Sequence, residues 1–214
     1  MIRKNNISDG KFIIVAILSV LCLFTLTVNF ADAKNMPSDQ QIKNVNSNVN
    51  EAQKTLNSID KYQEKYFEIV KRNNVLLSFE TNSELKKDRK ELKKLFKEVQ
   101  KQVTNKDYLK EYKAIQKRYA KFNGETTVDI NEFAQNYNKE VDTLLNKVYK
   151  DVKLKIPAAD FKQLVLSERK WLQEVQNYKK VFDSKEFGTI GTSTYYDYET
   201  NMKEFRTLLL LLYL

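Results

Sequence analysis

Residues that break helices are rare in this chain, which has only four glycines and two prolines among 214 residues. Glycine and proline are the least favourable residues inside a helix, by about 1 and 3 kcal/mol relative to alanine. Lysine, glutamate, leucine and glutamine, which favour helices, are abundant. We therefore expect an all-α protein, built as an antiparallel helical bundle.

Apolar residues recur at helical spacing along the N-terminal half. The stripe over residues 40–77 has heptad spacing and predicts a long helix that packs against a partner helix. Ser83 is a candidate N-cap for a second helix, and Asn105-Lys106-Asp107 can break or cap the chain before a third. Asn123-Gly124 is the clearest helix stop. These signals predict a helical, coiled region that ends near residue 124.

The C-terminal half reads as three further helices. A fourth helix is predicted over residues 130–156 and a fifth over 158–185. Pro157 either ends the fourth helix or lies in the first turn of the fifth. A loop over 187–193 holds two of the four glycines and precedes a last helix, whose Leu208 to Leu212 run is too short to span a membrane and is expected to pack inside the bundle.

Residues 1–33 have the pattern of a secretory signal peptide. Three basic residues precede an almost wholly apolar run over residues 12–30, and Ala31-Asp32-Ala33 offers a small-x-small cleavage site. An uncleaved anchor is the alternative, because such a run is just long enough to span a bilayer. Cys22, the only cysteine, lies in this run, so the exported chain has no disulfide. We expect a secreted or cell-envelope protein cleaved near Ala33, divided into 34–124 and 125–214.

The positive charge is concentrated in residues 86–121, which hold fourteen Lys and Arg against five Asp and Glu, a net +9. Residues 34–85 are balanced and residues 122–214 carry a net −1. Six lysines follow helical spacing and form what we call the lysine ridge: Lys86, Lys90, Lys93, Lys94, Lys97 and Lys101.

A ridge of this kind attracts polyanions. For an exported protein these are phosphate-bearing wall polymers or anionic lipid headgroups, whereas nucleic acid is not expected outside the cell. The alternative is a solvated helix face that keeps residues 86–121, which we expect to form a basic helical hairpin, soluble.

The residue types present argue against an enzyme. The chain has no histidine, and no cysteine after residue 33, so histidine bases, thiol nucleophiles and the usual zinc sites are absent. Neither a phosphate-binding glycine loop nor a calcium loop is found in the sequence. We expect no catalytic residue, no metal site and no cofactor.

Spaced landmarks distinguish the C-terminal half from a generic helical chain. They are Leu145-Asn146-Lys147-Val148-Tyr149, Leu164, Glu168-Arg169-Lys170-Trp171, Tyr178, Gly188-Thr189-Ile190-Gly191-Thr192, Tyr195, Arg206 and Tyr213-Leu214. Their order and spacing resemble the LprI-like family of exported bacterial proteins, named for a lysozyme inhibitor. The resemblance is confined to the C-terminal part and makes residues 125–214 an LprI-like helical domain.

The resemblance implies an exported, non-enzymatic binding protein whose partner is a lysozyme or another wall-active protein. Its implied binding residues are Asn146, Trp171, Gly188, Gly191, Tyr195 and Arg206. Because lysozymes are commonly basic, the basic hairpin would repel one, so residues 122–214, and the 187–193 loop first, are expected to carry any inhibition. The alternative function is an envelope structural or adhesion-like module, held to wall polymer or lipid by the lysine ridge.

Each landmark also has a purely structural interpretation. Trp171 lies on an apolar stripe and is expected in the core. Asn146 is expected to satisfy the backbone of the glycine loop, and Arg206 either pairs with Asp197, Glu199 or Glu204 or stays solvated. The sequence also departs from the family: Phe133 and Tyr198 stand where cysteines are expected, and Glu174-Val175-Gln176 replaces a Tyr-Arg-Asp element.

Overall fold

The computed structural model describes residues 39–72, 83–122, 124, 126–182 and 190–214, and, of these, the side chains of residues 51–177 and 191–214. The predicted signal segment 1–33 and Gly188 lie outside the described residues. By packing, residues 46–214 form one compact unit. The description that follows concerns the unit 46–214.

The described part of the chain has six α-helices and no strand, which confirms the predicted all-α bundle. The helices are α2 (Asp39–Lys71), α3 (Ser83–Gln102), α4 (Lys106–Tyr119), α5 (Thr127–Lys155), α6 (Ala158–Phe182) and α7 (Ile190–Leu210), followed by a short 3-10 helix, η3 (Leu211–Tyr213). Among these helices, none has the length and apolar character needed to cross a membrane.

Local signals explain where several helices begin and end. The Asn105 side chain accepts a hydrogen bond from the Tyr108 backbone N–H and caps α4, as predicted. At the start of α5, Thr126 and Asp129 form a reciprocal capping box. α5 ends because Ile156, which precedes Pro157, is extended, and the Pro157 carbonyl then accepts from the Phe161 N–H as α6 begins.

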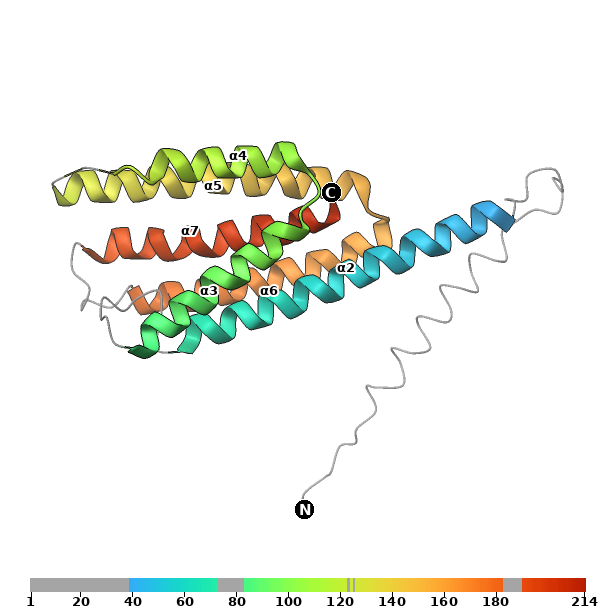
Figure 1. The fold of residues 1–214 in the computed structure, drawn as a ribbon, viewed down its shortest axis with the longest axis horizontal. Coiled ribbons are helices and arrows are strands. Elements are labelled where there is room, and N and C mark those ends of the chain that lie inside the picture. Colours follow the sequence, from blue (N-terminus) through green and yellow to red (C-terminus); the bar gives the residue numbers. More distant parts are fainter. Residues whose placement is uncertain (1–38, 73–82, 123, 125, 183–189) are drawn as a thin grey trace, which may run out of the picture. The chain divides into compact units, whose positions relative to one another are not determined.

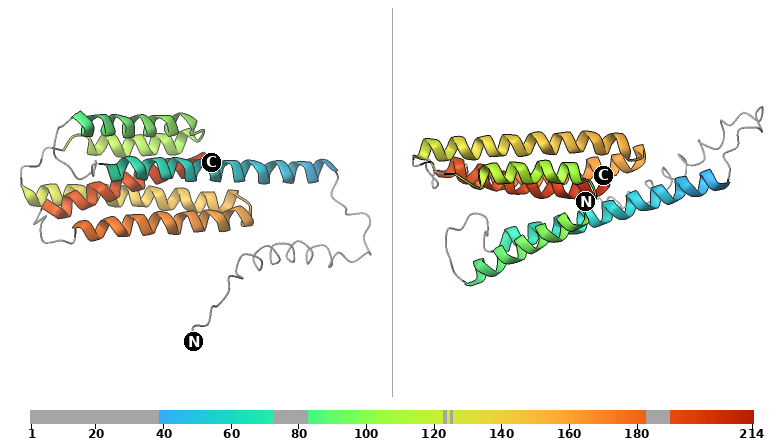
Figure 2. Two further views of the ribbon diagram at one scale, coloured as in Figure 1. Left: turned by 90° about the horizontal axis from the view of Figure 1, so that it is seen from below. Right: turned by 45° about the horizontal axis from the view of Figure 1, so that its top comes forward.

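Consecutive helices run in opposite directions, so α5 and α7 run in the same direction and pack side by side (Figure 1). α4 packs along the outer side of α5. α7 also contacts α6 and α3, so it lies between the α4–α5 layer and the helices on its other side (Figures 1 and 2). α7 is therefore the central helix.

One apolar core includes residues from all six helices. From Tyr198 to Leu211 every apolar residue of α7 and η3 is buried, including the Leu208–Leu211 run, as expected. Phe205 stacks on Tyr66 of α2 and packs against Phe96 of α3, at ring-centroid distances of 4.6 and 4.9 Å. The division at residue 124 stays a prediction, since helices on both sides of it share this core.

One predicted boundary was wrong, and another lies outside the described residues. α2 spans Asp39–Lys71, and residues 73–77, over which the apolar stripe was expected to continue, are not described. α7 begins at Ile190, so Gly191 lies in the first turn of α7 rather than in a loop over 187–193. α4 ends at Tyr119, with Ala120 as its C-cap, before the predicted stop at Asn123-Gly124, of which Asn123 lies outside the described residues. A Cβ atom at Gly124 would lie 2.7 Å from the Asp129 Cβ and would also collide with the Phe122 ring.

Candidate functional site

Five of the sequence landmarks line one cleft between α5, α6 and α7. Leu145, Asn146 and Tyr149 come from α5, and Glu168 and Trp171 from α6. The cleft has a volume of about 360 Å³, and the rest of its lining is Asp142, Leu172, Glu199, Lys203 and Leu210. Residues that are up to 68 positions apart in the sequence thus meet at one place, which we call the α5–α6–α7 cleft.

The inner wall of the cleft is apolar. Trp171 is 4% exposed, in agreement with its predicted place in the core, and Leu145 is also buried. The Trp171 indole Nε1–H has no hydrogen-bond acceptor within the described residues. Leu172, the next residue of α6, is 48% exposed at the rim. The cleft therefore joins a buried, unpaired donor to an exposed apolar edge.

The α7 side of the cleft carries an ion cluster around Lys203. The Lys203 ammonium lies 2.9 Å from Asp142 Oδ1 and 3.2 Å from Glu199 Oε1, and it donates to Asn138 Oδ1 at 2.9 Å. Its side chain is only 12% exposed. Glu199 and Lys203 are spaced i, i+4, as are Asp142 and Asn146, and this spacing was the available signal for Asp142 and Lys203, which sequence reasoning did not single out.

Arg206 is fully buried and pairs with Glu168. Both expected alternatives, a pair with Asp197, Glu199 or Glu204 and a solvated side chain, were therefore wrong. Arg206 Nε donates to Glu168 Oε1 at 2.8 Å, and its terminal nitrogens donate to Ser167 Oγ at 3.0 Å and Gln63 Oε1 at 3.3 Å. The three expected carboxylates lie on α7 itself, whereas the observed partners come from α6 and α2. Arg206 thus fixes Glu168 behind the cleft and is not a surface contact.

The remaining predicted site residues, as far as they are described, do not come together at one glycine loop. Asn146 is exposed, and its Nδ2 donates to the Asp142 backbone oxygen and Oδ2 one turn earlier, at 2.8 and 3.0 Å, so its amide is engaged within its own helix and not on the glycine loop. Gly191 is buried in α7. Tyr195 is half-buried, its ring 5.5 Å from that of Tyr196, and it does not line the cleft.

A second carboxylate, Glu204, is buried between α4, α5 and α7. It accepts hydrogen bonds from the Tyr137 hydroxyl and from Gln116 Nε2. Burial raises the pKa of Glu204, and these two hydrogen bonds only partly oppose the rise. Burial also raises the pKa of Tyr137. This cluster joins helices of the core and has no connection to the cleft lining.

All six lysines of the lysine ridge are exposed on α3, opposite the buried Leu92, Leu95 and Val99. No ion pair of a ridge lysine is found within the described residues. Two acidic side chains of α3, Asp88 and Glu91, are held by Arg72 instead, at 2.9 and 3.0 Å. The ridge therefore remains uncompensated along α3.

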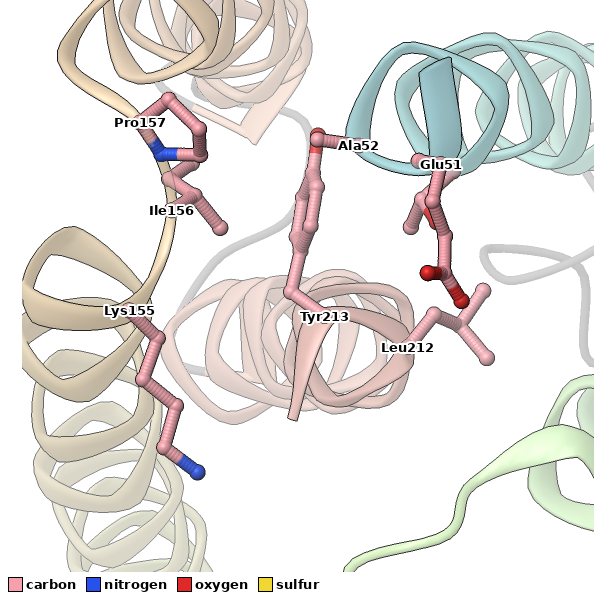
Figure 3. A pocket seen from close by; sticks show the side chains of 8 residues that line it. Glu51, Ala52, Lys155, Ile156, Pro157, Leu212 and Tyr213 are labelled. Atoms are coloured by element: carbon pink, nitrogen blue, oxygen red, sulfur yellow. The ribbon is translucent and has the colours of Figure 1, made fainter. Parts of the chain in front are cut away.

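A further hollow of about 440 Å³ lies between α2, the α5–α6 turn and the C-terminus (Figure 3). Lys155 and Glu51 line it, and the Tyr213 side chain extends across it toward Ala52 (Figure 3). It brings together no two of the predicted binding residues. Within the described part of the chain, no group of His, Cys, Asp and Glu is arranged to hold a metal ion.

The cleft lies within a stretch that a known family shares. Residues 118–210 match the family model described as "Lysozyme inhibitor LprI". No curated protein and no solved structure matches the chain. The match includes every described residue of the cleft lining and excludes α2, α3 and most of α4. The predicted resemblance is therefore confirmed, and the C-terminal part of the chain, residues 118–210, is LprI-like.

Proposed function

We propose that this chain is an exported, non-enzymatic binding protein that inhibits a lysozyme through its LprI-like part. The observation that carries the proposal is the convergence of the landmarks Leu145, Asn146, Tyr149, Glu168 and Trp171 on the α5–α6–α7 cleft. The matched family is described as an inhibitor, which agrees with a binding function rather than catalysis. Export rests on the pattern of residues 1–33 and stays a prediction, as does a binding role for the 187–193 loop.

The distribution of charge supports the LprI-like part as the inhibitory surface. Residues 122–214 carry a net −1, whereas residues 86–121 carry +9. Opposite charges favour association and like charges oppose it. A basic lysozyme would therefore be expected to approach the side of the cleft, where Asp142 and Glu199 lie, and to avoid α3.

A turbidity assay of wall lysis tests this proposal. Purified residues 34–214, which contain the whole compact unit 46–214, should slow clearing of a wall suspension by lysozyme in a saturable manner. Asn146→Arg, at an exposed position of the cleft lining, should weaken the protection, whereas Lys162→Gln, at an exposed position outside the cleft, should not. No protection at saturating protein would remove the proposed function.

A second candidate function is retention at an anionic surface by the lysine ridge. Its support is the set of six exposed lysines on α3 with no ion pair in the described residues. Exposed charges interact over about 10 Å at 0.1 M salt and much less at 1 M, so retention should fall steeply as salt rises.

Vesicles containing anionic lipid provide the test of this second candidate. The variant with Lys90, Lys93, Lys97 and Lys101 changed to Gln should no longer co-sediment with them at low salt. The same four positions changed to Arg keep the charge and should bind as the wild type does. Retention that is indifferent to salt and to the Gln changes would show that the ridge is a solvated helix face.

A further inference from the structure

We infer that the α5–α6–α7 cleft receives a lysine or arginine side chain of its protein partner. This inference rests on the proposed function, because that function supplies a protein as the partner, and it goes further by naming the group that the cleft recognises.

The charges of the lining leave a negative excess. Asp142, Glu168 and Glu199 are carboxylates, and Lys203 is the only basic residue in the lining. The Lys203 ammonium has three hydrogens and already has three oxygens within 3.2 Å, on Asp142, Glu199 and Asn138. It can therefore compensate no further charge. If Arg206, which pairs with Glu168, is included, the three carboxylates of the lining are still matched by only two cations, Lys203 and Arg206.

Acceptor capacity remains on these carboxylates. Each ionised carboxylate offers about four lone-pair positions. Arg206 uses only Oε1 of Glu168, and Glu168 Oε2 makes no hydrogen bond within the described residues. The Asp142 side chain is 45% exposed, so its oxygens can be reached from solvent. A cationic group that enters the cleft would find acceptors both at the mouth and farther in.

The rest of the lining suits the stem of a long basic side chain. Lysine and arginine have three or four methylene groups that pack on apolar surface while the charged end stays with polar groups. Tyr149 and the exposed Leu172 provide such a surface at the rim, with Leu145 and Trp171 buried beneath it. The cleft volume of about 360 Å³ falls within the roughly 300–1,000 Å³ typical of ligand pockets.

Trp171 argues against a sugar as the ligand of the cleft. A neutral sugar stacked on the indole would need an exposed ring, whereas Trp171 is 4% exposed and its Nε1–H is buried. The accessible carboxylate of Asp142 at the mouth favours a cationic side chain instead.

A fluorescence titration tests the cleft without any lysozyme. Trp171 is the only tryptophan of the chain, so its emission reports on this site alone. N-acetyl-arginine amide and N-acetyl-lysine amide should change the emission saturably in residues 34–214, and N-acetyl-citrulline amide, which is neutral, should not. Asn146→Arg should remove the response. If neither cationic probe has an effect, or if an N-acetylglucosamine oligomer acts instead, the inference is wrong whatever lysozyme does.

A binding titration with lysozyme then connects the cleft to the proposed function. The double variant Asp142→Asn, Glu199→Gln should bind lysozyme at least about tenfold more weakly than the wild type, the loss expected when an interfacial charge pair is broken. Asp107→Asn, Glu132→Gln makes the same charge change at exposed positions outside the cleft and should bind as the wild type. Circular dichroism would confirm that both variants fold.

The two proposals fail separately. If lysozyme does not bind the wild type while the cationic probes do respond, the proposed function is wrong and the cleft serves another basic partner. If lysozyme binds but the cleft variant binds equally well, the inference falls and the proposed function stands. Lysozyme with acetylated lysines, compared with lysozyme whose arginines are blocked by phenylglyoxal, identifies the inserted residue; full binding by both would also contradict the inference.

Discussion

At the scale of single residues, the buried Arg206 is the clearest case of a polar group that determines packing. A charge with no exposure to solvent is tolerated only where acceptors surround it, and Arg206 has three, on Glu168, Ser167 and Gln63. These acceptors come from α6 and α2, so only one arrangement of these helices around α7 satisfies the guanidinium. The pair therefore specifies which helices meet, although a buried ion pair by itself adds little net stability.

The first prediction concerns this pair. Arg206→Met should lower the free energy of unfolding by about 3–5 kcal/mol, because Glu168 is left without its cation in a poorly solvated place. Urea denaturation followed by circular dichroism measures the change. Adding Glu168→Gln to this variant should recover part of the loss, since the stranded charge is then gone. A double variant as unstable as the sum of the two single ones would show that the groups are not coupled.

A second prediction concerns the buried Glu204. Burial raises its folded-state pKa above the ordinary glutamate value, so the folded state holds the proton more tightly than the unfolded state. Its contribution to stability is therefore complete below the ordinary pKa and is lost as pH rises through the raised one. Burial raises the pKa of Asp160 and Asp197 as well, which acts in the same direction.

The substitution that tests this is Glu204→Gln, which keeps an oxygen to accept from Tyr137 and Gln116. It should raise the free energy of unfolding at pH 7 but not at pH 4, by about 1.4 kcal/mol for each unit of the pKa difference. Urea titrations at the two pH values measure it. Glu132→Gln, at an exposed position of α5, serves as the control. Equal destabilisation at both pH values would mean that the charge of Glu204 plays no part.

At the scale of elements, α7 differs from the other helices because its second half is buried on all sides. Leu208, Leu209, Leu210 and Leu211 follow one another and none is exposed. An ordinary surface helix has one apolar stripe, and a helix that is apolar all round belongs in the interior. The predicted packing of the Leu208–Leu212 run inside the bundle is confirmed for Leu208 to Leu211.

A third prediction compares two leucines that differ in burial. Leu209→Ala should lower the free energy of unfolding by about 2–5 kcal/mol, because it removes buried methyl groups and leaves a cavity against α5 and its neighbours. Leu154→Ala makes the same chemical change on α5, where the side chain is 83% exposed, and should alter stability by no more than about 0.5 kcal/mol. Thermal or urea denaturation of both measures the contrast, which should disappear if α7 is not central.

The predictions from sequence were correct where the cause is local. Asn105 and Pro157 act on their own turns, and the apolar stripes show which face of each helix is buried, so several helix bounds and the fold class followed from the residues alone. The start of α7 did not, because Gly191 is tolerated in a first helical turn once tertiary packing buries it. Arg206 was expected either to pair with nearby carboxylates on α7 or to stay solvated, whereas its partner Glu168 lies 38 positions away. Sequence spacing contains no information on that choice.

In the candidate site, too, local features could be predicted from the sequence and the contacts between helices could not. Trp171 was correctly expected to be buried, and Glu168 was recognised as part of a landmark, yet nothing in the sequence places them opposite Asp142, Glu199 and Lys203. That juxtaposition depends on α5 and α7 running in the same direction with α6 beside them. A cleft between three helices is a property of the fold, so it could be found only in the structure.

At the scale of the whole molecule, the two surfaces with proposed functions carry opposite charge. The lysine ridge lies on α3, within residues 86–121 of net charge +9, and the cleft lies among α5, α6 and α7, within residues 122–214 of net charge −1. An anionic surface and a basic protein would thus be attracted to different helices of one chain. Retention at the envelope and binding of a basic lysozyme are therefore compatible in electrostatic terms.

The fourth prediction follows from this separation. The ridge repels a basic lysozyme at long range without contacting it, so changing Lys90, Lys93, Lys97 and Lys101 to Gln should increase the association rate, by roughly 2–10-fold at low ionic strength. The dissociation rate should stay as it is, because the cleft is unaltered. Stopped-flow mixing with lysozyme measures the two rates at about 20 mM salt, where charges are weakly screened, and at about 500 mM salt, where they are strongly screened. Changing the same lysines to Arg keeps the repulsion and should leave association slow. A slower association for the Gln variant would mean that the ridge itself takes part in binding, and the assignment of inhibition to the LprI-like part would then be wrong.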